Sequence, residues 1–256
     1  MRWRNLLSPS DRQVFLKEAG QRLDTPTRRL FLRRAAGIGT IAALTGVAIV
    51  DGPSAEQALG AMSRFNDRVQ AWLFDPSRLA KTYSESEITR PFPFNAFYGP
   101  ADAPDAGDAY ELLVGGRVEN KRPWTIEQLR ALPQETQITQ HVCIEGWSAI
   151  GKWTGLSLRS FLLRARADLS AKYVTFNCLD RYSTQIDMAS ALHPQTILAL
   201  SFLDQPLPKM YGAPVRLRIP TKLGFKSAKH IYEIVVGNDH VEGFWENQGY
   251  NWFAGL

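Results

Sequence analysis

Cysteine is scarce in this sequence: its 256 residues include only two, Cys143 and Cys178. The sequence has no Cys-x-x-Cys-His motif for haem attachment and no cysteine cluster for an iron–sulfur centre. Two thiols do not make a disulfide scaffold, although an exported protein could join them. The four histidines show no paired ligand spacing with the cysteines, so a zinc site is a weak alternative. Each cysteine therefore needs a role of its own.

The chain beyond residue 50, which we call the body, also carries no excess of positive charge, although the formal net charge of the whole chain is +5. Residues 1–34 hold nine basic and three acidic side chains, and residues 35–50 carry no charge. Residues 51–256 have 21 basic and 22 acidic side chains. Because a nucleic-acid-binding body needs a basic patch of its own, this balance argues against a nucleic-acid partner.

The chain has no uninterrupted apolar run of the roughly 20 residues that a membrane-spanning helix needs. The uncharged segment 35–50 follows residues 27–33, Thr-Arg-Arg-Leu-Phe-Leu-Arg, which resemble the twin-arginine export signal at every informative place. The sequence therefore predicts export to the periplasm in the folded state. Residues 35–50 are then either removed with the signal or kept as a membrane tether, with the arginines on the cytoplasmic side.

Beyond residue 50, we expect a helical clasp and linker at residues 51–94 and the main domain at residues 95–256. A helix is predicted over residues 54–82, packed on the core through a stripe of apolar side chains: Ala58, Met62, Phe65, Val69, Trp72 and Leu73. The other predicted elements are helices at 126–131 and 156–167 and strands at 110–118, 136–142, 173–177, 215–219 and 231–236. Their order has no regular βαβ rhythm, which indicates an α+β fold.

Cys143 directly follows a predicted strand and precedes the glycine-containing segment 144–148. As a thiolate it would be a soft metal ligand or a nucleophile. A Cys-His pair with His141 is a further interpretation, although no motif supplies a group that would orient the histidine. A buried, inert thiol is the simplest interpretation. The residues alone leave these alternatives open.

A cluster of bases stands out in this otherwise neutral body, with five of them within fourteen positions: Arg216, Arg218, Lys222, Lys226 and Lys229. They surround a glycine turn at Gly224, whose backbone amides could line an anion pocket. The cluster favours a phosphate-bearing ligand, and a solvated, charged edge strand is an equally good explanation.

Together these segments resemble the sulfite-oxidase-fold molybdopterin enzymes, and most closely the exported YedY-like group that includes protein-methionine-sulfoxide reductases. Three blocks carry the resemblance: Asn-Ala-Phe-Tyr at 95–98, Cys-Ile-Glu-Gly-Trp-Ser at 143–148, and Gly-Ala-Pro-Val-Arg at 212–216 with Gly-Phe-Lys at 224–226. With residues 172–174 they cover about residues 90 to 256, in the family's order. The resemblance implies a sulfite-oxidase-type fold, mixed sheets with surrounding helices, and a molybdopterin-binding catalytic domain at residues 95–256.

The resemblance also implies that Cys143 is the protein thiolate on molybdenum in a Mo-molybdopterin cofactor. The residues that it assigns to the pterin are Asn95, Tyr98, Gly99, Cys178, Tyr211, Arg216, Ser227, Ala228 and Lys229. The chemistry agrees, because an anionic phosphate suits Arg216 and Lys229 and a soft metal suits a thiolate.

The chain departs from the reductase pattern at three of these places. Gly99 replaces an acidic residue, Cys178 replaces a threonine and Tyr211 replaces an asparagine. These changes alter the pocket that would receive methionine sulfoxide. A disulfide between the two cysteines also becomes a weaker interpretation, because the metal would already hold Cys143.

The predicted reaction is oxygen-atom transfer that reduces an S- or N-oxide group of a small-molecule or protein-bound substrate. Arg181 and Tyr182, just after Cys178, are expected to orient that substrate, although an ordinary turn explains residues 180–184 equally well. Electrons would come from a separate membrane haem or quinone-linked subunit, since the sequence shows no such centre of its own. The alternatives are a sulfite-type oxidase on the same fold and an exported binding protein without a metal.

Overall fold

The computed structural model describes residues 53–256, so the predicted export signal and the uncharged segment 35–50 lie outside the described residues. The chain divides into two compact units, Met1–Gly60 and Ala61–Leu256. Of the first unit the structure describes only the beginning of helix α3 (Pro53–Leu73), and the fold below is that of the second. No helix among the described residues is long and apolar enough to cross a membrane.

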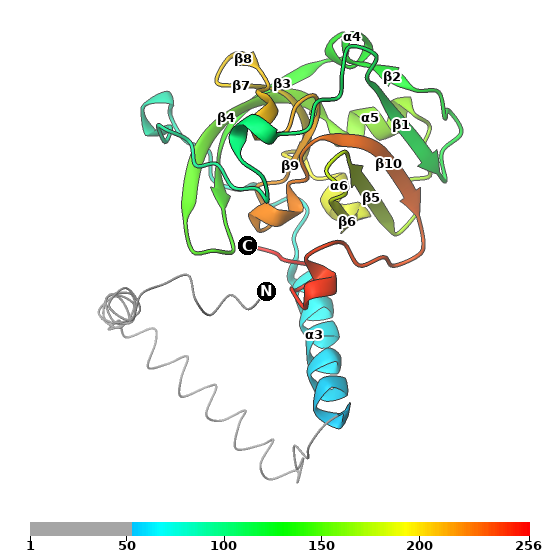
Figure 1. Cartoon of the computed structure of the whole chain (residues 1–256). Helices are drawn as coiled ribbons and strands as arrows, with labels where there is room; N and C mark the ends of the chain where they lie inside the picture. The colour runs from blue at the N-terminus through cyan, green and yellow to red at the C-terminus, as the bar shows by residue number, and fades with distance from the viewer. Residues whose placement is uncertain (1–52) are drawn as a thin grey trace, which may run out of the picture. The chain divides into compact units, whose positions relative to one another are not determined.

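The first sheet has five strands in the order β2-β1-β10-β5-β6 (Figure 1). They are β1 (Glu111–Gly116), β2 (Trp124–Thr125), β5 (Tyr173–Cys178), β6 (Ser183–Asp187) and β10 (Ile231–Gly237). β1 and β10 run parallel, and the other neighbouring pairs are antiparallel. Burial alternates along β1 and β5, where Leu112, Val114, Val174 and Phe176 face the core, because successive side chains of a strand point to opposite faces.

The second sheet follows the order β3-β4-β7-β8, with β9 paired to β7. Its strands are β3 (Gln134–Val142), β4 (Ser148–Ser157), β7 (Ile197–Phe202), β8 (Gln205–Pro206) and β9 (Arg216–Arg218). β3 and β4 form a long antiparallel hairpin in register from Gln134 opposite Leu156 to Val142 opposite Ser148. The end of this hairpin is where Cys143 lies.

Short helices join the strands. They are α4 (Ile126–Arg130), α5 (Leu158–Arg164) and α6 (Met188–Ala191), together with the 3-10 turns η2 (Glu85–Glu87), η3 (Pro100–Asp102), η4 (Lys209–Tyr211), η5 (Gly224–Lys226) and η6 (Glu246–Gln248). Side chains cap α4 and α6, since Thr125 accepts from the amide of Gln128 and Asp187 accepts from the amide of Ser190. The α5 face that carries Phe161 is fully buried in the main core.

The α+β class is confirmed, and the strands expected at 110–118, 136–142, 173–177, 215–219 and 231–236 correspond to β1, β3, β5, β9 and β10. The helix expected at 156–167 is shorter, because its first residues end β4 and Ser157 caps α5. The solvated edge strand is wrong for residues 216–218: Arg216 and Arg218 are 3% and 1% exposed. The two arginines are therefore buried charges that need partners.

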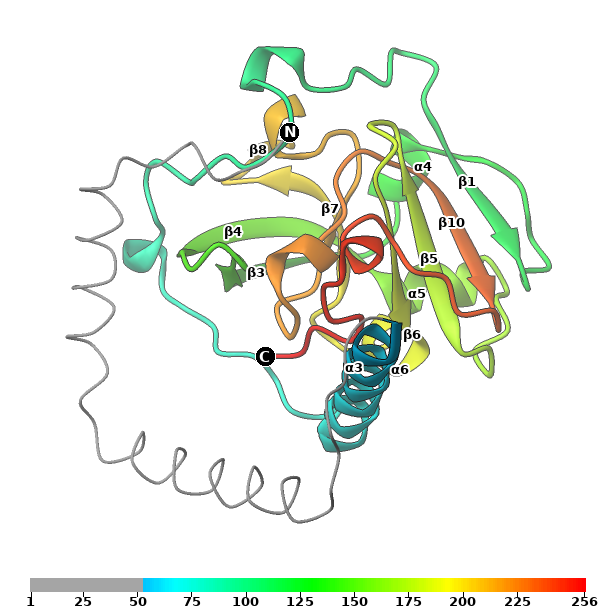
Figure 2. The same ribbon diagram turned by 60° about the horizontal axis from the view of Figure 1, so that its bottom comes forward.

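Helix α3 packs differently from the predicted clasp (Figure 2). It ends at Leu73, well before residue 82, and four of the six predicted apolar side chains are exposed: Met62, Phe65, Trp72 and Leu73. Val69 is half-buried, and the side chain of Ala58 lies outside the described residues. Polar residues attach the helix instead. Asp67 accepts a hydrogen bond of 2.7 Å from the amide of Phe253, and Gln70 accepts one of 3.2 Å from the amide of Gly255.

Two of the five clustered bases hold the C-terminal segment. The ammonium of Lys226 pairs with Glu246, and both side chains are almost completely buried. Lys222 donates to the carbonyl of Phe253 at 2.7 Å and pairs with Asp187 at 3.2 Å, while burial lowers its pKa to about 8. These lysines have their partners within the protein, so neither is available for a ligand.

Candidate functional site

Cys143 occupies the turn between β3 and β4. Its amide donates to the carbonyl of Trp147 at 2.9 Å, and the amide of Gly146 donates back to the carbonyl of Cys143 at 3.2 Å. Gly146 has a φ of +93°, a conformation that a side chain would strain, so the glycine permits this tight turn. The thiol side chain is only 8% exposed. The hairpin therefore holds one buried sulfur at its end.

Asn95 is the nearest polar neighbour of that sulfur. Its Nδ2 lies 3.7 Å from the Sγ of Cys143 and 3.1 Å from the Oε2 of Glu145, which also accepts from the Nε1 of Trp147 at 3.1 Å. Burial raises the pKa of Cys143, and the negative charge of Glu145 adds to the shift. A thiol in this setting becomes a thiolate when a cation binds beside it.

Lys229 adjoins the same asparagine. Its Nζ donates to the backbone carbonyl of Asn95 at 2.6 Å and lies 5.0 Å from the centre of the Phe94 ring. Burial and the nearby charge of Arg216 together lower the pKa of Lys229 to about 7, and an anion bound beside it would favour the charged form. Gly212, with a φ of +111°, packs against the lysine so closely that a Cβ there would lie 2.9 Å from the Cβ of Lys229.

Arg216 is a buried cation without an acidic partner among residues 53–256. One Nη donates to the carbonyl of Tyr211 at 2.9 Å, the guanidinium lies 4.8 Å from the ring centre of Trp153, and the Nε has no partner. Burial lowers its pKa to about 10, so the side chain is still charged at neutral pH. Because an unpaired buried charge costs several kcal/mol, roughly 3–5 when a partner is removed, the site suits an anionic ligand.

Like Arg216, Arg218 lacks an acidic partner among the described residues and has an unpaired Nε, but more of its guanidinium is hydrogen-bonded. It donates to Nδ1 of His141 at 2.8 Å, to Oγ1 of Thr139 at 3.3 Å and to Oγ of Ser227 at 3.4 Å. Burial and the two arginines hold the pKa of His141 well below its ordinary value, so the ring is neutral and accepts. A Cys-His pair is therefore a poor description, since His141 serves Arg218 in this structure.

Tyr98 belongs to a second polar chain. Its hydroxyl donates to Nε2 of His230 at 2.8 Å and lies 3.4 Å from Oδ2 of Asp180, while Nδ1 of His230 lies 2.7 Å from the carbonyl of Ala213. Sequence reasoning missed His230, although it directly follows Lys229.

Cys178 is 3% exposed at the end of β5, and burial raises its pKa well above the ordinary value. The two cysteines are both free thiols.

The structure does not bring all of the predicted residues together. Tyr182 donates its hydroxyl to the carbonyl of Phe225 at 2.5 Å, which leaves no free hydroxyl proton for a substrate. Arg181 is exposed in the turn between β5 and β6, with a φ of +65°. Gly99 is exposed before η3, and Ala228 is buried in the main core. The roles assigned to these four residues stay predictions.

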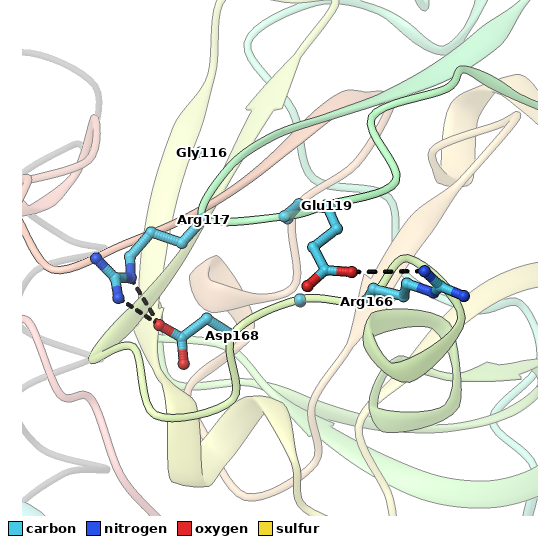
Figure 3. Close-up of a pocket in the computed structure, with 7 residues that line it drawn as sticks. Gly116, Arg117, Glu119, Arg166 and Asp168 are labelled. Carbon is cyan, nitrogen blue, oxygen red and sulfur yellow. Dashed lines mark hydrogen bonds and ion pairs between the residues drawn. The ribbon is translucent and has the colours of Figure 1, made fainter.

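An open hollow elsewhere on the molecule has ion pairs at its rim (Figure 3). Arg117 pairs with Asp168 at 2.5 Å, and Arg166 lies 3.6 Å from Glu119. The opposite charges of these residues neutralise one another, so the hollow does not attract a charged ligand, and no residue around Cys143 lines it.

Within residues 61–256 no group of three or more His, Cys, Asp or Glu side chains could hold a metal ion on its own.

The buried thiol and the neighbouring cations together suit an anionic cofactor that contains a soft metal. Residues 99–245, more than half of the chain, match the family described as the oxidoreductase molybdopterin binding domain. The chain therefore belongs to this family of molybdopterin-binding oxidoreductases, and it is an enzyme.

Two relatives in sequence support the same family. A protein of Azospira oryzae, named provisionally as the protein-methionine-sulfoxide reductase subunit YedZ1, is 54% identical over 93% of this chain and 92% of its own length. The protein-methionine-sulfoxide reductase catalytic subunit MsrP of Xanthomonas axonopodis pv. citri is 34% identical over 62% of this chain, which spans about half (48%) of that relative. The sulfane dehydrogenase SoxCD of Paracoccus pantotrophus aligns with a TM-score of 0.49 at 20% identity, covering 52% of this chain and 39% of its own.

The residues of this chain fit the molybdopterin group. Arg216 is a fully buried cation whose Nε has no partner, and Lys229 lies beside it and next to Asn95. An anionic phosphate would satisfy both cations. The sulfur of Cys143 makes only the weak hydrogen bonds typical of a thiol, 3.7 Å to Asn95 and 3.9 Å to Glu145, which a soft metal could replace.

Proposed function

We propose that this chain is a Mo-molybdopterin oxidoreductase in which Cys143 is the protein ligand of molybdenum. The observation that carries the proposal is the adjacency of the buried thiol, Asn95 and the cation Lys229, linked by contacts of 3.7 and 2.6 Å. A soft sulfur donor and an anion-binding cation are the two things that a metal dithiolene with a phosphate tail requires.

In this arrangement the protein residues bind the cofactor and orient it. When bound, the cofactor supplies a centre that exchanges two electrons and one oxygen atom with the substrate. Arg216 and Lys229 bind the anionic tail, and the carbonyl of Asn95 holds the ammonium of Lys229 in place. Trp153 packs against the guanidinium of Arg216 and keeps water from it, because the indole ring is fully buried.

The substrate class that we propose is an S-oxide, with N-oxides as the nearest chemical relatives. Two relatives are named as protein-methionine-sulfoxide reductase subunits. The screen that tests this follows reoxidation of the reduced holoenzyme by methionine sulfoxide, dimethyl sulfoxide and trimethylamine N-oxide, with sulfite added to the oxidised enzyme as the opposite direction. We expect reoxidation by at least one sulfoxide and no reduction by sulfite.

The same screen separates the alternatives. Reduction of the oxidised metal by sulfite, without reoxidation by any oxide, would establish a sulfite-type oxidase instead. Metal analysis of protein from a host that makes molybdopterin addresses the binding-protein alternative. Molybdenum far below one atom per chain in folded protein would contradict the proposed molybdenum cofactor.

We further propose that the chain is exported folded by its twin-arginine segment and receives electrons from a membrane haem or quinone-linked subunit. The support is the Thr-Arg-Arg-Leu-Phe-Leu-Arg sequence and the need to insert the cofactor before transport. Replacing Arg28 and Arg29 by lysine is expected to leave the protein in the cytoplasm with its molybdenum bound. Cell fractionation measures this, and unchanged export of the R28K/R29K variant would contradict it.

A further inference from the structure

The outer face of helix α3 is apolar and exposed. Met62, Phe65, Trp72 and Leu73 have exposed fractions of 62%, 65%, 82% and 66%. With about 100° between successive residues, all four lie within an arc of about 100° on one side of the helix. Surface helices of globular proteins normally turn such a stripe toward the core. We call these four side chains the outer face.

The helix cannot turn this face inward without losing specific contacts. Asp67 and Gln70, on the other side of the helix, accept hydrogen bonds from the backbone amides of Phe253 and Gly255. The charge of Asp67 also acts on the buried ammonium groups of Lys222 and Lys226, raising the pKa of each against the effect of burial, so both interactions keep the polar side of the helix toward the body. The outward direction of the apolar stripe is therefore built into the fold.

We propose that the outer face docks this protein on a lipid surface rich in anionic headgroups. Arg64 and Arg68 are exposed on the same helix, and Arg78 is exposed shortly after it. An amphipathic helix with tryptophan and phenylalanine on one face and arginines beside them is the pattern that binds in the plane of a membrane interface. The arginines add attraction to anionic lipid.

The position of α3 in the sequence supports a lipid surface. It begins at Pro53, three residues after the uncharged segment 35–50. The proximity of α3 to a membrane rests on the proposed export with segment 35–50 kept as the tether: three residues span at most about 11 Å, so the membrane that receives the segment lies within reach of α3. The area argues against a second protein: two aromatic side chains bury about 150–250 Å² each, and two more aliphatic ones leave the patch below the roughly 800 Å² per partner of a standard interface.

The test uses the full chain with a cysteine introduced at the outer face, Phe65→Cys, carrying a polarity-sensitive fluorophore. The native thiols are 8% and 3% exposed, so the introduced one is labelled selectively. Vesicles of phosphatidylglycerol and phosphatidylcholine are expected to shift the label to bluer emission. The matched control is Leu163→Cys on α5, which is 54% exposed, and its label should not respond.

Two further variants make the proposal falsifiable. Trp72→Ser with Leu73→Ser should weaken the partition of the chain onto anionic vesicles at least about tenfold, because each large apolar group contributes strongly to burial. Arg64→Gln with Arg68→Gln should remove the preference over pure phosphatidylcholine. Unchanged thermal unfolding shows that these exposed positions leave the fold intact. A label shift that follows protein concentration without vesicles would establish pairing with a second copy and overturn the proposal, as would a label indifferent to vesicles.

Discussion

Cys143→Ser is expected to lower turnover by more than about a hundredfold and to remove most of the bound molybdenum. Loss of a residue that merely supports a metal ligand costs about 10- to 100-fold, so a larger loss distinguishes the ligand from its neighbours. A serine hydroxyl is a harder donor than a thiolate and is not ionised at neutral pH. The measurements are steady-state turnover with a sulfoxide and molybdenum content per chain.

Two variants close to the thiol serve as comparisons for Cys143→Ser: one replaces a supporting residue and the other is a control. Asn95→Ala should fall within the 10- to 100-fold range expected of a supporting residue, because its Nδ2 is 3.7 Å from the sulfur. Ser148→Ala, exposed at the start of β4 in the same hairpin, should behave like the parent protein. If Cys143→Ser turned over at the parental rate with full metal content, the thiol would not be the ligand.

Arg216→Met and Arg218→Met are expected to change stability in opposite directions. Arg216 has no acidic partner in the described chain, and replacing a buried charge by an apolar side chain is neutral or stabilising by about 1–4 kcal/mol. Arg218 donates to His141 and Thr139, so its loss leaves buried acceptors unpaired at about 1–3 kcal/mol each. Urea unfolding of protein made without molybdopterin measures this difference.

The same two variants should also differ in cofactor content. From a host that makes molybdopterin, Arg216→Met is expected to retain less than about a tenth of the parental pterin, because the charge-assisted contacts to the phosphate are lost. Arg122→Met is the matched control, since Arg122 is also an arginine over a tryptophan ring, 4.5 Å from the centre of Trp124, but exposed. Should metal-free Arg216→Met prove as unstable as Arg218→Met, the charge of Arg216 would be satisfied inside the protein and its ligand role refuted.

Local patterns predicted local structure well in this chain. The alternation along residues 215–219 predicted β9, and the capping residue Thr125 predicted the start of α4. The family resemblance correctly indicated a molybdopterin-binding oxidoreductase. Strands β4, β6 and β7 were missed. Of these, β7 is a short apolar run that is buried on nearly every residue and shows no alternation.

The sequence does not predict which acidic side chain, if any, pairs with each basic side chain. Lys226 and Arg216 look alike in a list of bases, yet Lys226 is neutralised by Glu246 and Arg216 is not neutralised by any described acid. The spacing of α3 likewise predicted an apolar stripe but not the side it faces. That direction depends on Asp67 reaching the amide of Phe253, 186 positions away.

The contacts that complete the neighbourhood of Cys143 have a kinetic consequence. The β3–β4 hairpin joins residues that are close in sequence, whereas Lys229 reaches Asn95 across 134 positions and His230 reaches Tyr98 across 132. Contacts that close large loops form late, because the chain entropy of closure must be overcome first. Strand β1 pairs with β10 across a similar span, Leu113 opposite Glu233, so the contacts over Cys143 are expected to form together with the first sheet and after the hairpin.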